Sequence, residues 1–163
     1  MTNLSFRGLN ALGLFGCVAG MAFALYLEHV KHFEPCPMCI FQRIAFIVMG
    51  LFFLAGAIHN PLATGRRVYA TLLLLAAAIG VGIAARHIWV QHQPPDPMAG
   101  CAPGWNYMIQ NFPLSTALKK AFTGDADCAQ ITWTFLGMSM PEWTLICYIL
   151  LGTGALWAGF RKR

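Results

Sequence analysis

The sequence predicts an all-α membrane protein, a four-transmembrane-helix bundle with a long outer loop containing a short interfacial helix. Of the 163 residues, 58% are hydrophobic and only 10% are charged, whereas about a quarter of an average soluble domain is charged. We therefore expect the whole chain to form a single membrane domain. Four segments also approach the roughly 20 apolar residues that a helix needs to cross a bilayer, namely residues 9–27, 40–58, 68–85 and 143–160.

The first apolar segment is expected to be a retained span. Its apolar run, Leu9 to Leu27, is longer than the ~7–15 residues of a signal-peptide core. No small-x-small cleavage site leads from it into a soluble domain.

The distribution of charge predicts the orientation of the bundle. An even number of spans places both termini on one side, together with the short segment 59–67. That side carries Lys and Arg and no acid, whereas all six acids fall in the outer loops, residues 28–39 and 86–142. Short loops rich in Lys and Arg face the cytoplasm, so both termini are predicted to be cytoplasmic. The net charge of +5 is then a topology signal, the surroundings are membrane lipid, and no nucleic-acid partner is expected.

The second outer loop is long and contains the pattern of a short helix. Apolar residues recur there at helical spacing opposite Lys119 and Lys120, and Gly124 follows them. This pattern predicts a helix that lies on the membrane surface. Aromatic residues then lead into the last span through the interfacial zone. The apolar members of the short helix are Leu114, Ala117, Leu118, Ala121 and Phe122.

Six cysteines divide into two groups by their predicted depth. Cys17 and Cys147 lie inside spans, where an apolar environment keeps a thiol inert, so we expect small buried hydrophobes. The others lie in outer segments, and disulfides persist outside the cytoplasm. These outer residues are Cys36, Cys39, Cys101 and Cys128.

The Cys-x-x-Cys motif stands at the start of the second span. Proline is favoured at the first position of a helix, so Pro37 predicts Cys36 as the N-cap and Cys39 as the third helical residue. The helix N-terminus favours the nucleophilic thiolate, which indicates a labile redox disulfide. A passive structural disulfide is the alternative, but this pair closes too small a loop to restrain the unfolded chain much.

Arg43 follows Cys39 by four residues and therefore lies on the same helix face, one turn deeper. Inserting a charge at the centre of a span costs about 2.5–3.5 kcal/mol, so a charge at such a position indicates a functional site. We expect Arg43 to donate hydrogen bonds to a quinone carbonyl and to stabilise the negative charge that develops when a thiolate attacks the ring. Snorkelling to lipid phosphates is the alternative. His87, just beyond the third span, is a further candidate for this site or a surface histidine.

Cys101 lies in a segment without helix or strand periodicity, after three prolines in four positions, and is expected to be extended and accessible. Cys128 can close a loop with it, either as a purely structural disulfide or as part of a relay. The separate Cys-x-x-Cys pair favours the relay. Asp125 and Asp127 precede Cys128 and repel an approaching thiolate, so attack by a partner is expected at Cys101.

These features together resemble the bacterial disulfide bond formation protein B (DsbB) family. The resemblance covers nearly the whole chain and includes the Pro35 to Cys39 motif with Arg43, the second cysteine pair, the four spans and the 137–141 approach to the last span. It implies a quinone-dependent oxidoreductase of the bacterial inner membrane. Such an enzyme uses ubiquinone or menaquinone to reoxidise a soluble periplasmic thioredoxin-fold dithiol oxidase of the DsbA type.

The resemblance also implies roles for individual residues. By position, Cys36 and Cys39 match the quinone-facing pair, with Cys39 next to the quinone. Cys101 matches the cysteine that the soluble partner attacks, and Cys128 matches its mate. The residues that match the quinone site are Arg43 and His87.

Two other readings stay open at this point. A vitamin K epoxide reductase-like quinone reductase also places Cys-x-x-Cys at the outer end of a span, but with a different motif order. His29, His32, Cys36 and Cys39 form a plausible zinc ligand set, which would leave the remaining outer cysteines without a role. Covalent haem attachment is disfavoured because Ile40 stands where the motif needs histidine.

Overall fold

The computed structural model describes residues 5–33, 35–93, 110–113, 115–116, 126–129, 131 and 133–161. Four of its helices are long and apolar enough to cross a membrane, which confirms the predicted four-helix membrane fold. The chain is thus a multi-pass membrane protein. The four helices are α1 (Phe6–Lys31), α2 (Pro37–His59), α3 (Ala63–Gln91) and α7 (Met140–Phe160). Between α3 and α7 lie α6 (Ala126–Ala129), β1 (Thr134–Phe135) and β2 (Met138–Ser139).

Each expected apolar segment lies inside one of the long helices, and each helix extends beyond it. The bounds follow from the caps. Helix α1 ends at Lys31, and the C-cap His32 has a left-handed backbone (φ 56°) and bonds through its N–H to the carbonyl of Leu27. Helix α2 begins at Pro37 with Cys36 as its N-cap, as predicted. The apolar residues of the expected interfacial helix lie outside the described residues.

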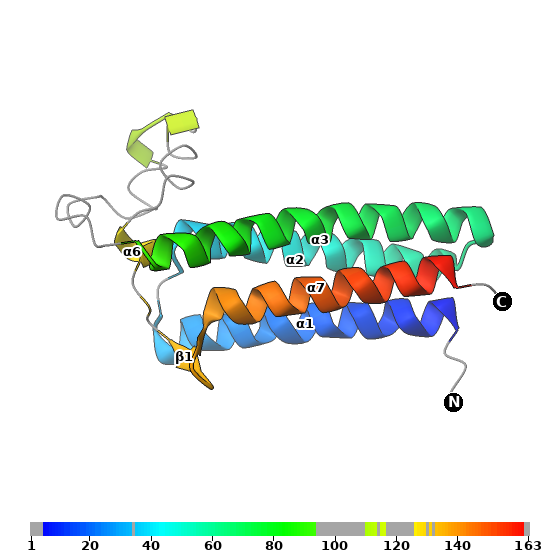
Figure 1. Ribbon diagram of the computed structural model, residues 1–163, viewed down its shortest axis with the longest axis horizontal. Coiled ribbons are helices and arrows are strands. Elements are labelled where there is room, and N and C mark those ends of the chain that lie inside the picture. Colours follow the sequence, from blue (N-terminus) through cyan, green and yellow to red (C-terminus); the bar gives the residue numbers. More distant parts are fainter. Residues whose placement is uncertain are drawn as a thin grey trace.

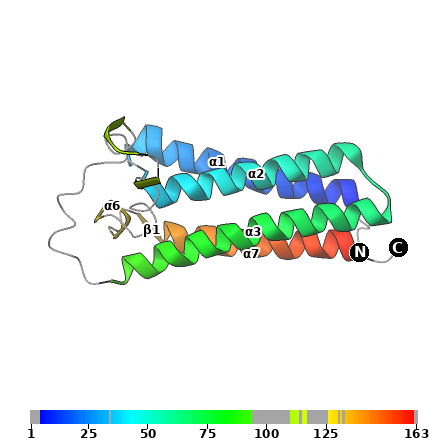
Figure 2. The same ribbon diagram turned by 90° about the horizontal axis from the view of Figure 1, so that it is seen from above.

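The helices pack in the order α1, α2, α3, α7 around the bundle (Figures 1 and 2). Figure 2 shows α1 and α2 in one layer and α3 and α7 in the other. The start of α1 and the end of α7 lie at one end of the bundle, and α6 and β1 lie at the other (Figure 1). We call the latter the cysteine end, because Cys36, Cys39 and Cys128 lie there.

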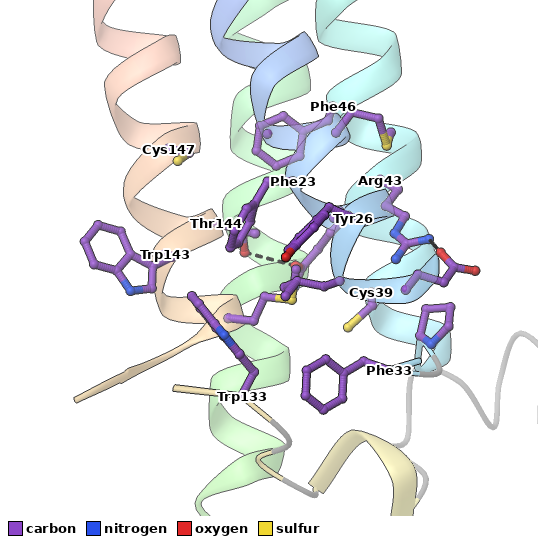
Figure 3. A pocket seen from close by; sticks show the side chains of 18 of the residues that line it. Phe23, Tyr26, Phe33, Cys39, Arg43, Phe46, Trp133, Trp143, Thr144 and Cys147 are labelled. Carbon is purple, nitrogen blue, oxygen red and sulfur yellow. Dashed lines mark hydrogen bonds and ion pairs between the residues drawn. The ribbon is translucent and has the colours of Figure 1, made fainter. Parts of the chain in front are cut away.

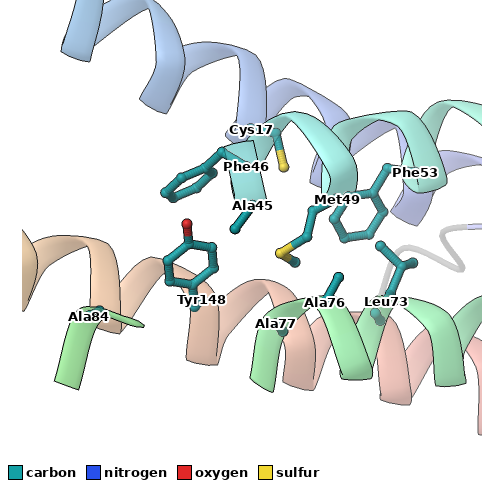
Figure 4. Packing of buried hydrophobic residues seen from close by; sticks show 11 residues of the cluster. Cys17, Ala45, Phe46, Met49, Phe53, Leu73, Ala76, Ala77, Ala84 and Tyr148 are labelled. Atoms are coloured by element: carbon teal, nitrogen blue, oxygen red, sulfur yellow. The ribbon is translucent and has the colours of Figure 1, made fainter. Parts of the chain in front are cut away.

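The core of the bundle combines a few large side chains with many small ones (Figure 4). Tyr148 is fully buried and stacks on Phe46, with ring centroids 4.5 Å apart. Small residues let α3 and α7 approach closely, and such close packing drives helix association where lipid removes the hydrophobic driving force. Cys17 is buried as predicted, whereas Cys147 is exposed, so its predicted burial is wrong. The small residues of α3 and α7 include Ala76, Ala77, Ala84, Gly152 and Ala155.

A short β-hairpin, with strands of two residues each, precedes α7 and was not expected from the sequence. Strands β1 and β2 pair antiparallel, with Phe135 opposite Met138. The turn residues Leu136 and Gly137 both have positive φ, 53° and 78°, as a tight hairpin turn requires. The hairpin leads directly into the capping box of α7, in which the Glu142 carboxylate accepts a hydrogen bond from the Ser139 backbone N–H.

The contact between Gly80 and Tyr148 provides a test of the α3 packing. A Cβ added at Gly80 would lie 2.5 Å from the Tyr148 ring, whereas one added at Gly82 would meet nothing within 4 Å. We expect Gly80→Ala to lower the free energy of unfolding in detergent by about 1–3 kcal/mol, because overpacking forces a rigid ring to move. The matched control, Gly82→Ala, is expected to show no loss. Equal stability of the two variants would contradict this packing.

Candidate functional site

An apolar cavity of about 600 Å³ lies between α1, α2 and α7 at the cysteine end (Figure 3). Its walls are mainly hydrophobic and aromatic, with a few polar groups, as is common for sites that bind small molecules. Phe135 of β1 contributes one ring, and Trp133, the residue before β1, contacts Phe23 of α1 edge to face with centroids 5.6 Å apart. The main aromatic residues of the wall are Phe23, Tyr26, Phe46, Trp133, Phe135 and Trp143.

Opposite charges meet at the cavity wall. The Arg43 guanidinium of α2 donates a hydrogen bond to the Glu28 carboxylate of α1, and both side chains line the cavity. Their side chains are 20% and 30% exposed. An ion pair lowers the cost of a charge in an apolar bundle. Arg43 therefore faces the cavity with a protein partner, which argues against the snorkelling alternative.

Glu28 was not singled out from the sequence. The available signal was an acid in the last turns of an apolar span, but which residue it meets depends on how α1 and α2 pack. Lys31 also lines the cavity, one turn further along α1.

The Cys-x-x-Cys pair lies at the N-terminus of α2, where Pro37 begins the helix. Cys36 Sγ accepts a hydrogen bond from the Cys39 backbone N–H at 3.4 Å, and the two sulfurs lie 3.1 Å apart. Cys39 is half-buried and lines the cavity, whereas the buried Cys36 does not. The pair thus presents one sulfur to the cavity and keeps the other inside the protein.

The protonation of Cys36 differs from the expectation of a thiolate. Hydrogen bonding with Cys128 and Cys39, followed by burial, raises the pKa of the Cys36 thiol above its usual range. Cys36 donates its proton toward Cys39 Sγ, so Cys39 is the acceptor of the two sulfurs. The dipole of α2 favours an anion, but the neighbouring sulfurs outweigh it at Cys36.

Cys128 and His87 lie on the side of Cys36 that faces away from the cavity. The sulfurs of Cys36 and Cys128 and a ring nitrogen of His87 lie within 4.8 Å of one another. Cys128 is fully buried on α6, which packs against α3. Cys36 therefore lies within reach of both Cys39 and Cys128. The remaining site cysteine, Cys101, lies outside the described residues.

His87 is 2% exposed, so the surface-histidine alternative is wrong. Its Nε2 lies 3.7 Å from Cys36 Sγ, and its Nδ1 lies 3.3 Å from Gln42 Nε2. His87 does not line the cavity, whereas Gln42 does. Contact between His87 and a quinone stays a prediction, and the position of His87 shows a closer relation to Cys36.

The alternative zinc ligand set of His29, His32, Cys36 and Cys39 is not assembled. Both histidines are exposed, and His29 Nδ1 lies 3.1 Å from the Leu25 carbonyl of its own helix. Among the described residues, the group close enough to share a metal ion is instead Cys36, His87 and Cys128.

Comparison with known proteins gives a consistent result. A family model described as "Disulfide bond formation protein DsbB" matches residues 6–158. A relative from Acinetobacter baumannii named "Disulfide bond formation protein B" is 46% identical over 159 residues, which cover 97% of this chain and 93% of the relative. Relatives of the same name from Nitrosococcus oceani and Methylococcus capsulatus are 44% and 47% identical, over 94% and 96% of this chain and 91% and 95% of their own lengths.

Proposed function

The chain belongs to the disulfide bond formation protein DsbB family and is a disulfide-generating membrane oxidoreductase, and from this premise we propose that it oxidises a soluble periplasmic thioredoxin-fold dithiol protein and passes the electrons through two cysteine pairs to ubiquinone or menaquinone. The observation that carries the proposal is the position of Cys39, whose side chain lines an apolar cavity of about 600 Å³.

The cavity fits a quinone head group in size and chemistry. Its volume is within the range of about 300–1,000 Å³ usual for small-molecule sites. Aromatic walls suit a flat ring, and Arg43 places hydrogen-bond donors on the wall for a carbonyl oxygen. A bound quinone supplies a two-electron acceptor. The Arg43 guanidinium would orient it and stabilise negative charge near Cys39.

The arrangement of sulfurs supports a defined order of thiol exchange. With the inner disulfide Cys36–Cys39 formed, a Cys128 thiolate attacks Cys36 Sγ, the Cys36–Cys39 bond breaks, and Cys39 takes the electron pair as a thiolate. Cys101 then attacks Cys128 Sγ, which forms the outer disulfide and releases Cys36 as a thiolate. Two electrons have moved from the outer to the inner pair, and each step is an exchange through a mixed disulfide.

Electrons enter the outer pair from the soluble partner. The nucleophilic thiolate of the partner attacks Cys101, and the second partner thiol releases the oxidised partner, which leaves Cys101 and Cys128 reduced. Asp127 next to Cys128 disfavours attack there, because like charges repel.

Charge supports an orientation with the cysteine end in the periplasm and both termini in the cytoplasm of a bacterial inner membrane. The basic residues described at the opposite end have no acidic neighbours in sequence, and short basic segments face the cytoplasm. The acids Glu28 and Glu142 lie toward the cysteine end. The basic residues concerned are Arg7, Arg66, Arg67 and Arg161.

The proposed function is tested by mixing the purified protein anaerobically with a short-chain ubiquinone and a reduced thioredoxin-fold dithiol protein, and following quinol absorbance. We expect one quinol for each partner disulfide formed. Cys128→Ser is expected to abolish turnover, because the outer pair then cannot reduce Cys36. The control Cys17→Ala is expected to retain it, since Cys17 is buried in the core. Quinol formation by Cys128→Ser at the full rate would refute the four-cysteine relay.

Arg43 provides a separate test of the quinone site. We expect Arg43→Ala to raise the KM for quinone by about tenfold or more, because a hydrogen bond from a charged group is worth about 1.5–3 kcal/mol. The KM for the dithiol partner is expected to change little. Arg86→Ala serves as the matched control, because Arg86 lies at the same end of the bundle but packs over Trp89. An unchanged quinone KM in Arg43→Ala would remove Arg43 from the site.

A further inference from the structure

A series of side-chain contacts crosses the bundle from the cavity to Cys36. Thr144 Oγ1 of α7 lies 2.9 Å from Gln42 Oε1 of α2 and 2.9 Å from the Pro141 carbonyl, so its one proton is shared between these two acceptors (Figure 3 shows Thr144 at the cavity). The other end of the amide, Gln42 Nε2, lies 3.3 Å from His87 Nδ1 of α3. His87 Nε2 in turn lies 3.7 Å from Cys36 Sγ, within hydrogen-bond reach of a sulfur. Three helices thus meet at one glutamine.

The network is buried, so its hydrogen bonds have to be satisfied within the protein. Gln42 is 4% exposed and His87 is 2% exposed. An unsatisfied polar group in an apolar interior is costly, which favours one arrangement of donors and acceptors over a mixture. Tyr148 adds an anchor that leaves the amide untouched, because its hydroxyl donates to the backbone carbonyl of Gln42 at 2.6 Å.

The orientation of the Gln42 amide, with Oε1 toward Thr144 and Nε2 toward His87, determines which nitrogen of His87 carries the proton. A carbonyl oxygen only accepts and an amide nitrogen only donates. With Oε1 bonded to Thr144, Gln42 presents its N–H to His87, so His87 Nδ1 has to be the acceptor. A neutral imidazole then carries its proton on Nε2, the nitrogen that faces Cys36 Sγ, and the Cys128 backbone is a second hydrogen-bond partner of the ring.

We propose that Gln42, held by Thr144, is a positioning residue that keeps His87 in the Nε2–H tautomer, so that His87 donates a hydrogen bond to Cys36 Sγ and stabilises its thiolate. The consequence for electron transfer rests on the proposed function. When Cys101 attacks Cys128, the Cys36–Cys128 bond breaks and its electron pair goes to Cys36 Sγ. A stabilised thiolate leaves faster, and His87 keeps its proton throughout this step.

The tautomer is measured directly by ¹⁵N NMR of histidine-labelled protein, with the His87 signals assigned by their loss in His87→Gln. We expect Nδ1 without a proton and Nε2 with one in the unsubstituted protein. Gln42→Met and Thr144→Val are expected to give a mixture of tautomers. The control Tyr148→Phe is expected to keep the single tautomer, because it removes a bond only to the Gln42 backbone. A proton on Nδ1 of the unsubstituted protein would overturn the proposal, since Gln42 would then face His87 through its oxygen.

A second readout reports on Cys36 itself and needs neither quinone nor partner, so it can fail independently of the proposed function. In a background in which Cys39, Cys101 and Cys128 are Ser and Cys17 and Cys147 are Ala, the pH profile of iodoacetamide reaction follows the Cys36 thiolate. We expect Gln42→Met to shift this profile upward by about one pH unit and to slow alkylation at pH 7 about tenfold, because the thiolate loses a well-oriented donor. Thr144→Val is expected to shift the pH profile in the same direction. This second variant provides the test if Gln42→Met does not fold. Profiles identical to the parent in both variants would reject the role of Gln42.

Discussion

The position at which α2 begins is the constraint on which the rest of the site depends. Pro37 cannot continue a helix backward, so Cys36 becomes the N-cap and Cys39 lies in the first turn. Residues three apart lie near each other on a helix but point in somewhat different directions. Here Cys39 Sγ faces the cavity, whereas Cys36 Sγ lies close to Cys128 and His87. A shift of this helix start by one residue would separate the sulfurs from both neighbours.

Helix α2 also explains how polar groups are tolerated inside an apolar bundle. Arg43 is paired with Glu28 from α1, and Gln42 is bonded to Thr144 from α7 and contacts His87 from α3. Because adjacent residues of one helix point to different neighbours, the Arg43–Glu28 pair and the Gln42 contacts with Thr144 and His87 lie in different parts of the bundle. The charged pair lies at the cavity wall, where a ligand with carbonyl oxygens would meet it. The neutral set links that wall to Cys36 and holds no net charge in the bundle.

The sequence predicts the local features well, because each depends on a short stretch of chain. The four spans follow from apolar length, the cap at Cys36 follows from Pro37, and the position of Arg43 on the same helix face as Cys39 follows from their spacing. Features that depend on how distant helices pack were missed, including the partner Glu28, the bond between Gln42 and Thr144, and the exposure of Cys147. The hairpin was missed because its turn places Leu136, a residue that rarely adopts positive φ, in that conformation.

The central claim is that Cys36 joins the two cysteine pairs, because its sulfur lies within reach of both Cys39 and Cys128. The most direct measurement is acid quenching of the protein during a single turnover with reduced partner, followed by mass-spectrometric mapping of the disulfides. The account predicts a transient linkage between Cys36 and Cys128 that rises and decays before the inner pair is reoxidised. A transient linkage of Cys39 to Cys128, with Cys36 never joined to Cys128, would contradict it.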